Sequence, residues 1–382
     1  SLFSLSRYAR DWPSENPASR KQVRSMDKRK NRKLLNFVSN PKYLMVLATI
    51  GIFLVIYAFG AIVYGAKGFT KLRTFMMLFV DNAYIGISAV CMTMVLITGG
   101  IDLSVAAVAS LTGMFLAYGT TVLGLNPWLC MAFSVFVGIA LGLGMGALVT
   151  YLKIPPFVAT LTGMFLARGV CSLISRESIS INNEVIDALA GWKVYFMKYS
   201  GGEWVKIKPV AYINLNVVLF IVMILLGTYI LQKTRFGRNV YAIGGNEQSA
   251  RLMGLPVDRT KMMVYGFNGL CSALAGIAYA LYVKSGWNLA LQGGELDVIS
   301  AAVIGGVLLS GGVGYMVGTF FGVLLKAVIP CLITFNGTLS SWWGKIITGL
   351  LVLLFVALQQ IVMSRSRHGK KAKAKVKTQG RS

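Results

Sequence analysis

Few residues in this chain of 382 are arranged as catalytic residues usually are. The single histidine, His368, lies in a basic tail, so a histidine metal site or catalytic triad is excluded. The string nearest to a phosphate-binding loop, Gly337 to Gly344-Lys345, has the wrong spacing and is followed by Ile346. Paired carboxylates and nucleophile motifs are absent, and all five cysteines lie inside apolar runs. We therefore expect no enzymatic activity, no metal and no bound cofactor.

The most informative polar stretch is 232–262, which is rich in glycine and arginine. Its middle, 246–253, can form a short helix, because Glu247 near the start and Arg251 near the end suit the helix dipole. Gly254 is well placed to end that helix. Such an amphipathic helix suits docking to another subunit; the alternative is a solvated loop held at lipid phosphates by its arginines.

Composition places these residues in a membrane protein. Hydrophobic residues make up 55% of the chain and charged residues 13%, against about 25% charged in an ordinary soluble domain. A soluble enzyme, a secreted disulfide scaffold and a disordered protein are excluded. The net charge of +25 could suggest a nucleic-acid partner. However, 25 of the 38 Lys and Arg residues lie in 1–42, 232–261 and 359–382, which instead predicts that these segments are cytoplasmic.

Ten apolar runs approach the length of about 20 residues that a bilayer span needs. They lie near 44–63, 75–97, 103–123, 128–151, 156–174, 213–231, 263–283, 298–310, 315–334 and 342–359. An even number of spans puts both termini on the cytoplasmic side, as the charges require. The sequence thus predicts an all-α polytopic membrane protein.

The spans define the domain organisation. A transmembrane domain at 43–360 lies between a basic N-terminal segment, 1–42, and a basic tail, 361–382. Residues 1–25 are polar and precede the first methionine, so we expect them to be an upstream extension. The segment 175–212 should form a cap or docking surface on the outer face.

Two segments indicate an internal repeat. The strings at 99–108 and 294–303 share a glycine, an aspartate and Ala-Ala-Val at a constant offset of 195 residues. They fall on the third and eighth predicted spans, which run in opposite directions. This favours an inverted five-plus-five repeat, and the alternative is coincidence in runs rich in glycine and alanine.

Polar residues inside the predicted spans are candidates for a transport pathway, because a bilayer rarely tolerates them without a function. Asp102 and Asp297 begin the repeat-related helices, where a carboxylate can cap free N–H groups; alternatively they lie at a gate. Lys326 should face the bundle interior or extend its amino group to the membrane interface. Arg168 should pair with an acid such as Glu177 or extend outward to the interface. The pathway or gate candidates are Asp81, Asn82, Asp102, Ser104, Asp297, Ser300 and Trp342, the last also suiting a membrane interface.

Longer strings carry a family resemblance. FGRNVYAIGGNEQSARLMGL, TGGIDLSVAAV and GGELDVISAAVIGGVLLSGGVG resemble the permease subunits of bacterial monosaccharide ABC importers, of the ribose, xylose and galactose type, over roughly residues 40–360. LKIPPFVATLTGMFLARGV, ESISIN and FNGTLSSWW are similar to permeases of galactofuranose importers. Two positions depart from the family pattern, Ala106 in place of a glycine and Lys326 in place of a neutral residue.

The resemblance implies a complex in the bacterial inner membrane. A second permease subunit, identical or different, pairs with this one, and a partner with two fused ATPase domains uses ATP and Mg²⁺. An extracytoplasmic binding protein delivers the sugar. The stretch 246–254 then becomes the coupling helix. The coupling residues implied are Gly237, Arg238, Gly244, Asn246, Glu247, Ala250, Arg251 and Gly254.

Two other functions stay open at this stage. A secondary transporter driven by Na⁺ or H⁺ fits a five-plus-five fold but does not need the loop 232–261. A branched-chain amino-acid ABC permease has a similar architecture, but the FNGTLSSWW and ESISIN strings argue against it.

Overall fold

A computed structural model describes residues 41–200, 203–206 and 209–379. The predicted extension 1–25 and most of the basic segment 1–42 lie outside these residues. Met45–Ser382 form one compact unit.

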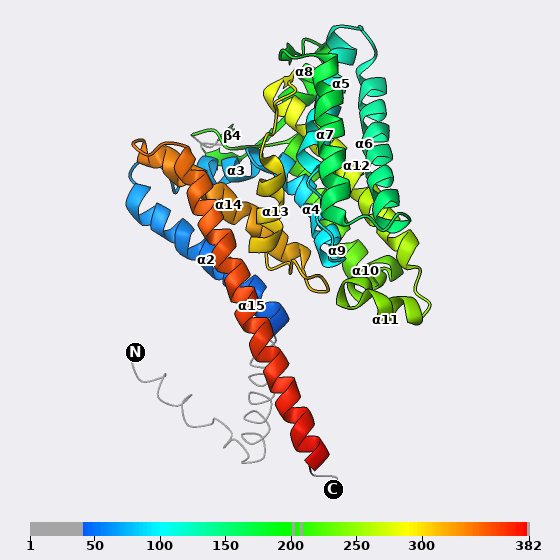
Figure 1. Cartoon of the computed structure of the whole chain (residues 1–382). Helices are drawn as coiled ribbons and strands as arrows, with labels where there is room; N and C mark the ends of the chain where they lie inside the picture. The colour runs from blue at the N-terminus through cyan, green and yellow to red at the C-terminus, as the bar shows by residue number, and fades with distance from the viewer. Residues whose placement is uncertain (1–40, 201–202, 207–208, 380–382) are drawn as a thin grey trace, which may run out of the picture. The chain divides into compact units, whose positions relative to one another are not determined.

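Long apolar helices dominate the described part of the chain (Figure 1). Seven are long and apolar enough to cross a membrane. They are α2 (Pro41–Tyr64), α6 (Pro127–Thr150), α7 (Pro156–Ile174), α9 (Leu215–Lys233), α12 (Val257–Val283), α14 (Met316–Asn336) and α15 (Trp342–Gln379). An eighth span is formed if α3 (Leu72–Val80) and α4 (Ala83–Ile97) are counted together, although they are bent by 53° at their junction.

Two predicted spans are shorter than expected. α5 (Val105–Thr121) has 17 residues, and α13 (Gly294–Ile304) has 11. The run predicted at 298–310 leaves the helix after Ile304, because Gly306 adopts the left-handed conformation with φ of +87°. Neither helix reaches about 20 residues, so the ten-span topology and the inverted repeat stay predictions.

The two copies of the repeated string differ in local structure. Asp102 lies in a non-helical segment before α5, whereas Asp297 lies in the first turn of α13. Asp102 is not the N-cap of α5, which is Ser104, but its carboxylate accepts a hydrogen bond from the backbone N–H of Ser104 at 2.7 Å just before the helix begins at Val105. Asp297 does occupy the position where a carboxylate favours the helix dipole.

α12 is the central helix and packs against α4, α5 and α6. Its contact with α6 depends on the glycine ladder Gly138, Gly142 and Gly146. A Cβ at Gly142 would collide with the carbonyl oxygen of Tyr265, so the two backbones touch directly. Small residues at this helical spacing allow two helices to approach closely in a membrane.

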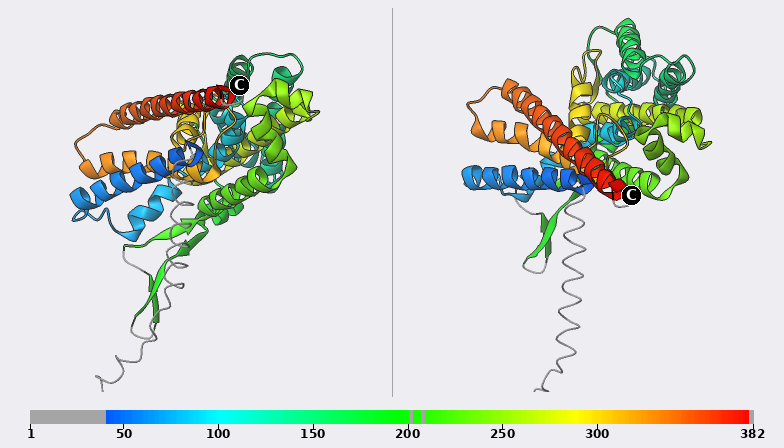
Figure 2. Two further views of the ribbon diagram at one scale, coloured as in Figure 1. Left: turned by 90° about the horizontal axis from the view of Figure 1, so that it is seen from below. Right: turned by 60° about the horizontal axis from the view of Figure 1, so that its bottom comes forward.

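The segment after α7 forms a small cap beside the C-terminal end of α12. It holds β1 (Ile179–Ser180), α8 (Glu184–Gly191), β2 (Lys193–Tyr195), β3 (Met197–Ser200), β4 (Glu203–Lys206) and β5 (Tyr212–Asn214). β1 pairs antiparallel with β6 (Ser285–Gly286), β2 with β5, and β3 with β4. α8 contacts α12, and the β3–β4 hairpin extends beyond the helices (Figure 2).

The opposite end of α12 carries α10 (Arg235–Gly245) and α11 (Glu247–Leu252) (Figure 1). With 27 residues, α12 is about 40 Å long. The cap and the α10–α11 segment are therefore separated by about the thickness of a bilayer.

Candidate functional site

The helix predicted at 246–253 is present as α11. Its N-cap, Asn246, accepts a hydrogen bond at Oδ1 from the backbone N–H of Ser249, at 2.8 Å. It ends before Gly254, whose φ of +75° is readily adopted only by a residue without a Cβ. The end predicted at Gly254 is thus confirmed, whereas the N-cap at Asn246 is a finding of the structure.

Ion pairs hold α11 against the start of α12. We call the four residues that form them the charged clamp: Glu247, Arg251, Asp258 and Lys261. Arg251 donates to both carboxylate oxygens of Asp258, at 2.7 and 3.0 Å. Glu247 accepts from Lys261 at 2.6 Å and is 3.4 Å from Arg251. Burial raises the pKa of Glu247, but the hydrogen bonds and charges of Lys261 and Arg251 together outweigh it and lower the pKa. The hydrogen bond to Asp258 is the main reason that the pKa of Arg251 is raised.

The end of α11 presents two apolar side chains to the surroundings. Leu252 is 89% exposed and Met253 is 68% exposed, whereas Ala250 is fully buried beside Ile243 and Val257. The sequence-based candidates did not include Leu252 and Met253. The sequence did contain a signal for them, because Leu252 and Met253 directly follow Arg251. Since Ala250 occupies the inward face of the helix, these two apolar residues are left on the outside. Adjacent exposed apolar residues on a polar helix favour contact with another protein.

The other coupling candidates on α10 are of two kinds. Gly237 and Gly244 are close-packing positions, since a Cβ at either would collide with backbone atoms. Arg238 is exposed. Tyr241, which was not predicted, donates its hydroxyl to the carbonyl of Gly314 at 2.6 Å. α10 is thereby attached to the loop between α13 and α14.

A second group of residues lies toward the other end of α12, and we call it the acid–tyrosine cluster: Asp81, Tyr84, Tyr279 and Tyr282. The hydroxyl of Tyr282 donates to Oδ1 of Asp81 at 3.0 Å. The ring of Tyr84 lies 5.0 Å from that of Tyr279 and 6.4 Å from that of Tyr282. Carboxylate and phenol groups can exchange hydrogen bonds with a hydroxylated ligand.

Only Asp81 of this cluster was predicted. The tyrosines come from α4 and α12, which are distant in sequence, and single tyrosines in apolar runs carry no distinctive signal. Asn82, the predicted neighbour of Asp81, instead donates to the carbonyl of Leu78 at 3.1 Å and stabilises the bend between α3 and α4.

An ion pair joins α13 to α14 near this cluster. Nζ of Lys326 lies 3.1 Å from Oδ1 of Asp297, and the Lys326 side chain is only 10% exposed against 43% for Asp297. The carboxylate of Asp297 also acts electrostatically on Tyr84. The expectation that Lys326 faces the interior is confirmed, because a partner offsets the charge there.

The other predicted aspartate, Asp102, is buried apart from the cluster. It accepts from Nδ2 of Asn268 at 2.7 Å, and from the backbone N–H and hydroxyl of Ser104 at 2.7 and 2.6 Å. Asp102 and Ser104 are each 1% exposed. This geometry attaches the α4–α5 connection to α12.

The remaining predicted residues lie elsewhere. Ser300 is half-buried on α13, and no hydrogen bond of its side chain is seen in the described residues. Trp342 begins α15, is 66% exposed and lies under the amino group of Lys345, which is 4.8 Å from its ring centre. Arg168 donates to the carbonyls of Asn288 and Ala290, at 2.8 and 2.7 Å, rather than to Glu177.

Together, the apolar helices, the polar cluster beside the cap and the exposed helix at the other end define a multi-pass membrane transport subunit. Over residues 74–357 the chain matches the family described as "Branched-chain amino acid transport system / permease component". The chain belongs to this family of ABC-importer permeases, and it is a transport subunit of the inner membrane rather than an enzyme.

The curated relatives refine this placement. The chain is 42% identical over 319 residues to the inner membrane ABC transporter permease protein YjfF of Escherichia coli strain K12, covering 83% of this chain and 92% of the relative. It is 36% identical over 321 residues to the fructose import permease protein FruG of Bifidobacterium longum, covering 83% and 91%. It is 36% identical over 275 residues to the ribose import permease protein RbsC of Bacillus subtilis, covering 72% and 81%. No solved structure matches the chain significantly.

Proposed function

We propose that this chain is the membrane subunit of an importer that takes up a monosaccharide, with galactofuranose as the first candidate, by alternating access driven by a separate ATPase. Relatives named as fructose and ribose import permeases support a sugar. The strings ESISIN and FNGTLSSWW support galactofuranose in particular.

The observation that carries the proposal is the exposed apolar pair Leu252 and Met253 on a firmly attached α11. The pair suits a hydrophobic groove on the ATPase. The charged clamp holds α11 to α12, so a displacement of α11 moves α12 with it. Arg251 then acts within the clamp rather than as a contact to the ATPase.

α12 connects this docking point to the polar groups near its other end. Tyr279 and Tyr282 lie on its last turns, about 35 Å along the helix from its start beside α11. Movement driven by the ATPase would therefore alter the spacing between these tyrosines and Asp81 or Tyr84. A change of that kind can expose or close a pathway for a hydroxylated substrate.

The proposal includes the partners and the orientation. Two fused ATPase domains, using ATP and Mg²⁺, bind the face that carries α11, and both termini lie on that cytoplasmic face. A binding protein approaches the cap, and a second permease subunit, identical or different, completes the membrane domain. Labelling of cysteines introduced at Ala190 and Gly245 with a membrane-impermeant reagent tests this orientation, which requires opposite sides.

ATP hydrolysis by the reconstituted importer tests the substrate. We expect the binding protein to stimulate hydrolysis when loaded with a monosaccharide, in a screen that includes galactofuranose, ribose and fructose. Stimulation by branched-chain amino acids alone would overturn the sugar assignment and favour the function named in the family description.

Substitution of the exposed pair tests the coupling. Leu252→Asp should leave membrane insertion unchanged but abolish binding of the ATPase and uptake, since it places a charge in an apolar contact. Leu252→Met is the matched control and should retain uptake. Normal uptake by Leu252→Asp would contradict the role of α11.

A further inference from the structure

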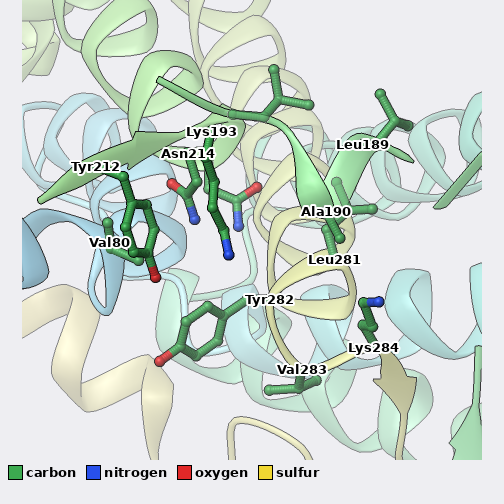
Figure 3. Close-up of a pocket in the computed structure, with 12 residues that line it drawn as sticks. Val80, Leu189, Ala190, Lys193, Tyr212, Asn214, Leu281, Tyr282, Val283 and Lys284 are labelled. Atoms are coloured by element: carbon green, nitrogen blue, oxygen red, sulfur yellow. The ribbon is translucent and has the colours of Figure 1, made fainter. Parts of the chain in front are cut away.

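A cavity of about 300 Å³ lies between the cap and the C-terminal end of α12 (Figure 3). Lys193 and Tyr212 on the paired strands β2 and β5 form one side of it, and Val80 and Tyr282 form the other. Small-molecule pockets have volumes of about 300–1,000 Å³. The cavity therefore suits one monosaccharide better than an oligosaccharide.

Hydrogen-bond donors converge on this cavity. The amino group of Lys193 is 4.8 Å from the ring centre of Tyr212 and points into the space between the rings of Tyr212 and Tyr282 (Figure 3). Lys193 has no ion-pair partner among the residues that the structure describes. Asn214 uses its Oδ1 to cap α9, accepting from the N–H of Val217 at 3.1 Å, which leaves its amide NH₂ as a donor.

The charge of the lining argues for an acceptor-rich ligand that carries no positive charge. No residue that lines the cavity is acidic. The second lysine, Lys284, is already paired with Asp187 at 2.7 Å. A free amino acid could pair its carboxylate with Lys193, but its ammonium group would find no carboxylate on the lining. The hydroxyl and ring oxygens of a sugar can accept from Lys193 and Asn214, and its C–H faces can lie against the tyrosine rings.

The cavity also adjoins the acid–tyrosine cluster. Tyr282 belongs to both, because its side chain lines the cavity while its hydroxyl donates to Asp81 at 3.0 Å. A ligand that leaves the cavity past Tyr282 meets Asp81 and Tyr84 next.

We propose that this cavity is a receiving subsite that holds one monosaccharide molecule before it enters the pathway. Lys193 and Asn214 bind its oxygens, and Tyr212 and Tyr282 pack against it. The inference rests on the proposed function, which it extends by assigning a site on the permease itself.

Protection of an introduced cysteine tests the subsite in the reconstituted importer. Val283→Cys places a thiol on the lining, in a background where the half-buried Cys331 is replaced by serine. A membrane-impermeant thiol reagent is applied with D-galactose, D-ribose, D-fructose or L-leucine. Leu289→Cys is the control, because Leu289 is 48% exposed on the neighbouring loop but does not line the cavity.

We expect at least one monosaccharide to slow the labelling of Val283→Cys by about threefold when its concentration is twice its dissociation constant. L-Leucine should have no effect, and labelling of Leu289→Cys should be unchanged throughout. The further change Tyr212→Ala should abolish protection, whereas Tyr212→Phe, which keeps the ring, should retain it.

Three results would overturn the subsite. The first is that Val283→Cys does not react with the reagent although Leu289→Cys does, and the second is that none of the sugars protects Val283→Cys. The third is that only sugar-free binding protein protects it, which would make the cavity a docking site for that protein. If loaded binding protein still stimulates ATP hydrolysis in those cases, the proposed function stands without the subsite. Protection by L-leucine alone would contradict both.

Discussion

The backbone of Gly244 lies directly against the carbonyl oxygen of Ile97, so that a Cβ at residue 244 would collide with it. The same carbonyl accepts a hydrogen bond from the N–H of Gly312 at 2.8 Å. Gly244 lies in the last turn of α10, Ile97 ends α4, and Gly312 lies between α13 and α14. The helices α4 and α10 and the loop between α13 and α14 thus meet two residues before the N-cap of α11.

We expect Gly244→Ala to abolish uptake while the protein still inserts, because even one methyl group must push apart this junction. Gly245→Ala is the matched control, since nothing lies within 4 Å of a Cβ there. Uptake and ATP hydrolysis, measured in parallel, check the prediction. Equal uptake in the two variants would show that the junction does not transmit movement.

The ion pair between Asp297 and Lys326 should matter for stability in an asymmetric way. Asp297→Asn leaves Lys326 charged and nearly buried without its partner. Breaking a buried pair typically lowers the free energy of unfolding by about 3–5 kcal/mol, and we expect about 1–3 kcal/mol because Asp297 is partly exposed. Adding Lys326→Met should recover most of the loss. Thermal unfolding of the purified variants measures both effects, and an equal loss in the single and double variants would contradict the pairing.

Tyr282→Phe isolates one hydrogen bond of the acid–tyrosine cluster. It removes the hydroxyl that donates to Asp81 and keeps the ring. A lost hydrogen bond of about 1 kcal/mol predicts roughly fivefold slower uptake. Tyr229→Phe, an exposed residue on α9, is the control and should transport normally. If the two variants transport at the same rate, the Tyr282 hydroxyl lies outside the pathway.

The charged clamp should weaken in acid. The folded protein holds the pKa of Glu247 below its ordinary value of 4.5, so Glu247 adds stability above that ordinary value. That contribution is lost as the pH falls through the lowered pKa. Hydrogen exchange of the 246–254 peptide, corrected for intrinsic rates, should therefore increase below about pH 4.5.

Glu247→Gln provides the control for this acid response. Its exchange should already be faster at neutral pH, because the ion pairs to Lys261 and Arg251 are gone. Its further increase in acid should be smaller than in the unmodified protein, because only Asp258, whose pKa is lowered by the hydrogen bond from Arg251, still titrates in the charged clamp. The same acid response in Glu247→Gln would assign the effect to another group.

Local signals predicted several features correctly. Gly254 ends α11 as predicted, because a left-handed turn at a helix end depends on a few neighbouring residues. The packing face formed by Gly138, Gly142 and Gly146 is also a local property, because their helical spacing puts all three on one side of α6. The helix boundary at Ile304, by contrast, depends on the left-handed turn at Gly306, which an apolar run rich in glycine does not reveal.

The sequence by itself determined that this is a helical membrane protein with a short polar helix at 246–253, because composition, periodicity and capping are properties of neighbouring residues. Only the tertiary structure decided the partners of the polar groups. Asp102 meets Asn268, Asp297 meets Lys326, and Asp81 meets Tyr282. These pairs join residues far apart in the chain, and the packing of α12 and α14 against the other helices brings them within bonding distance.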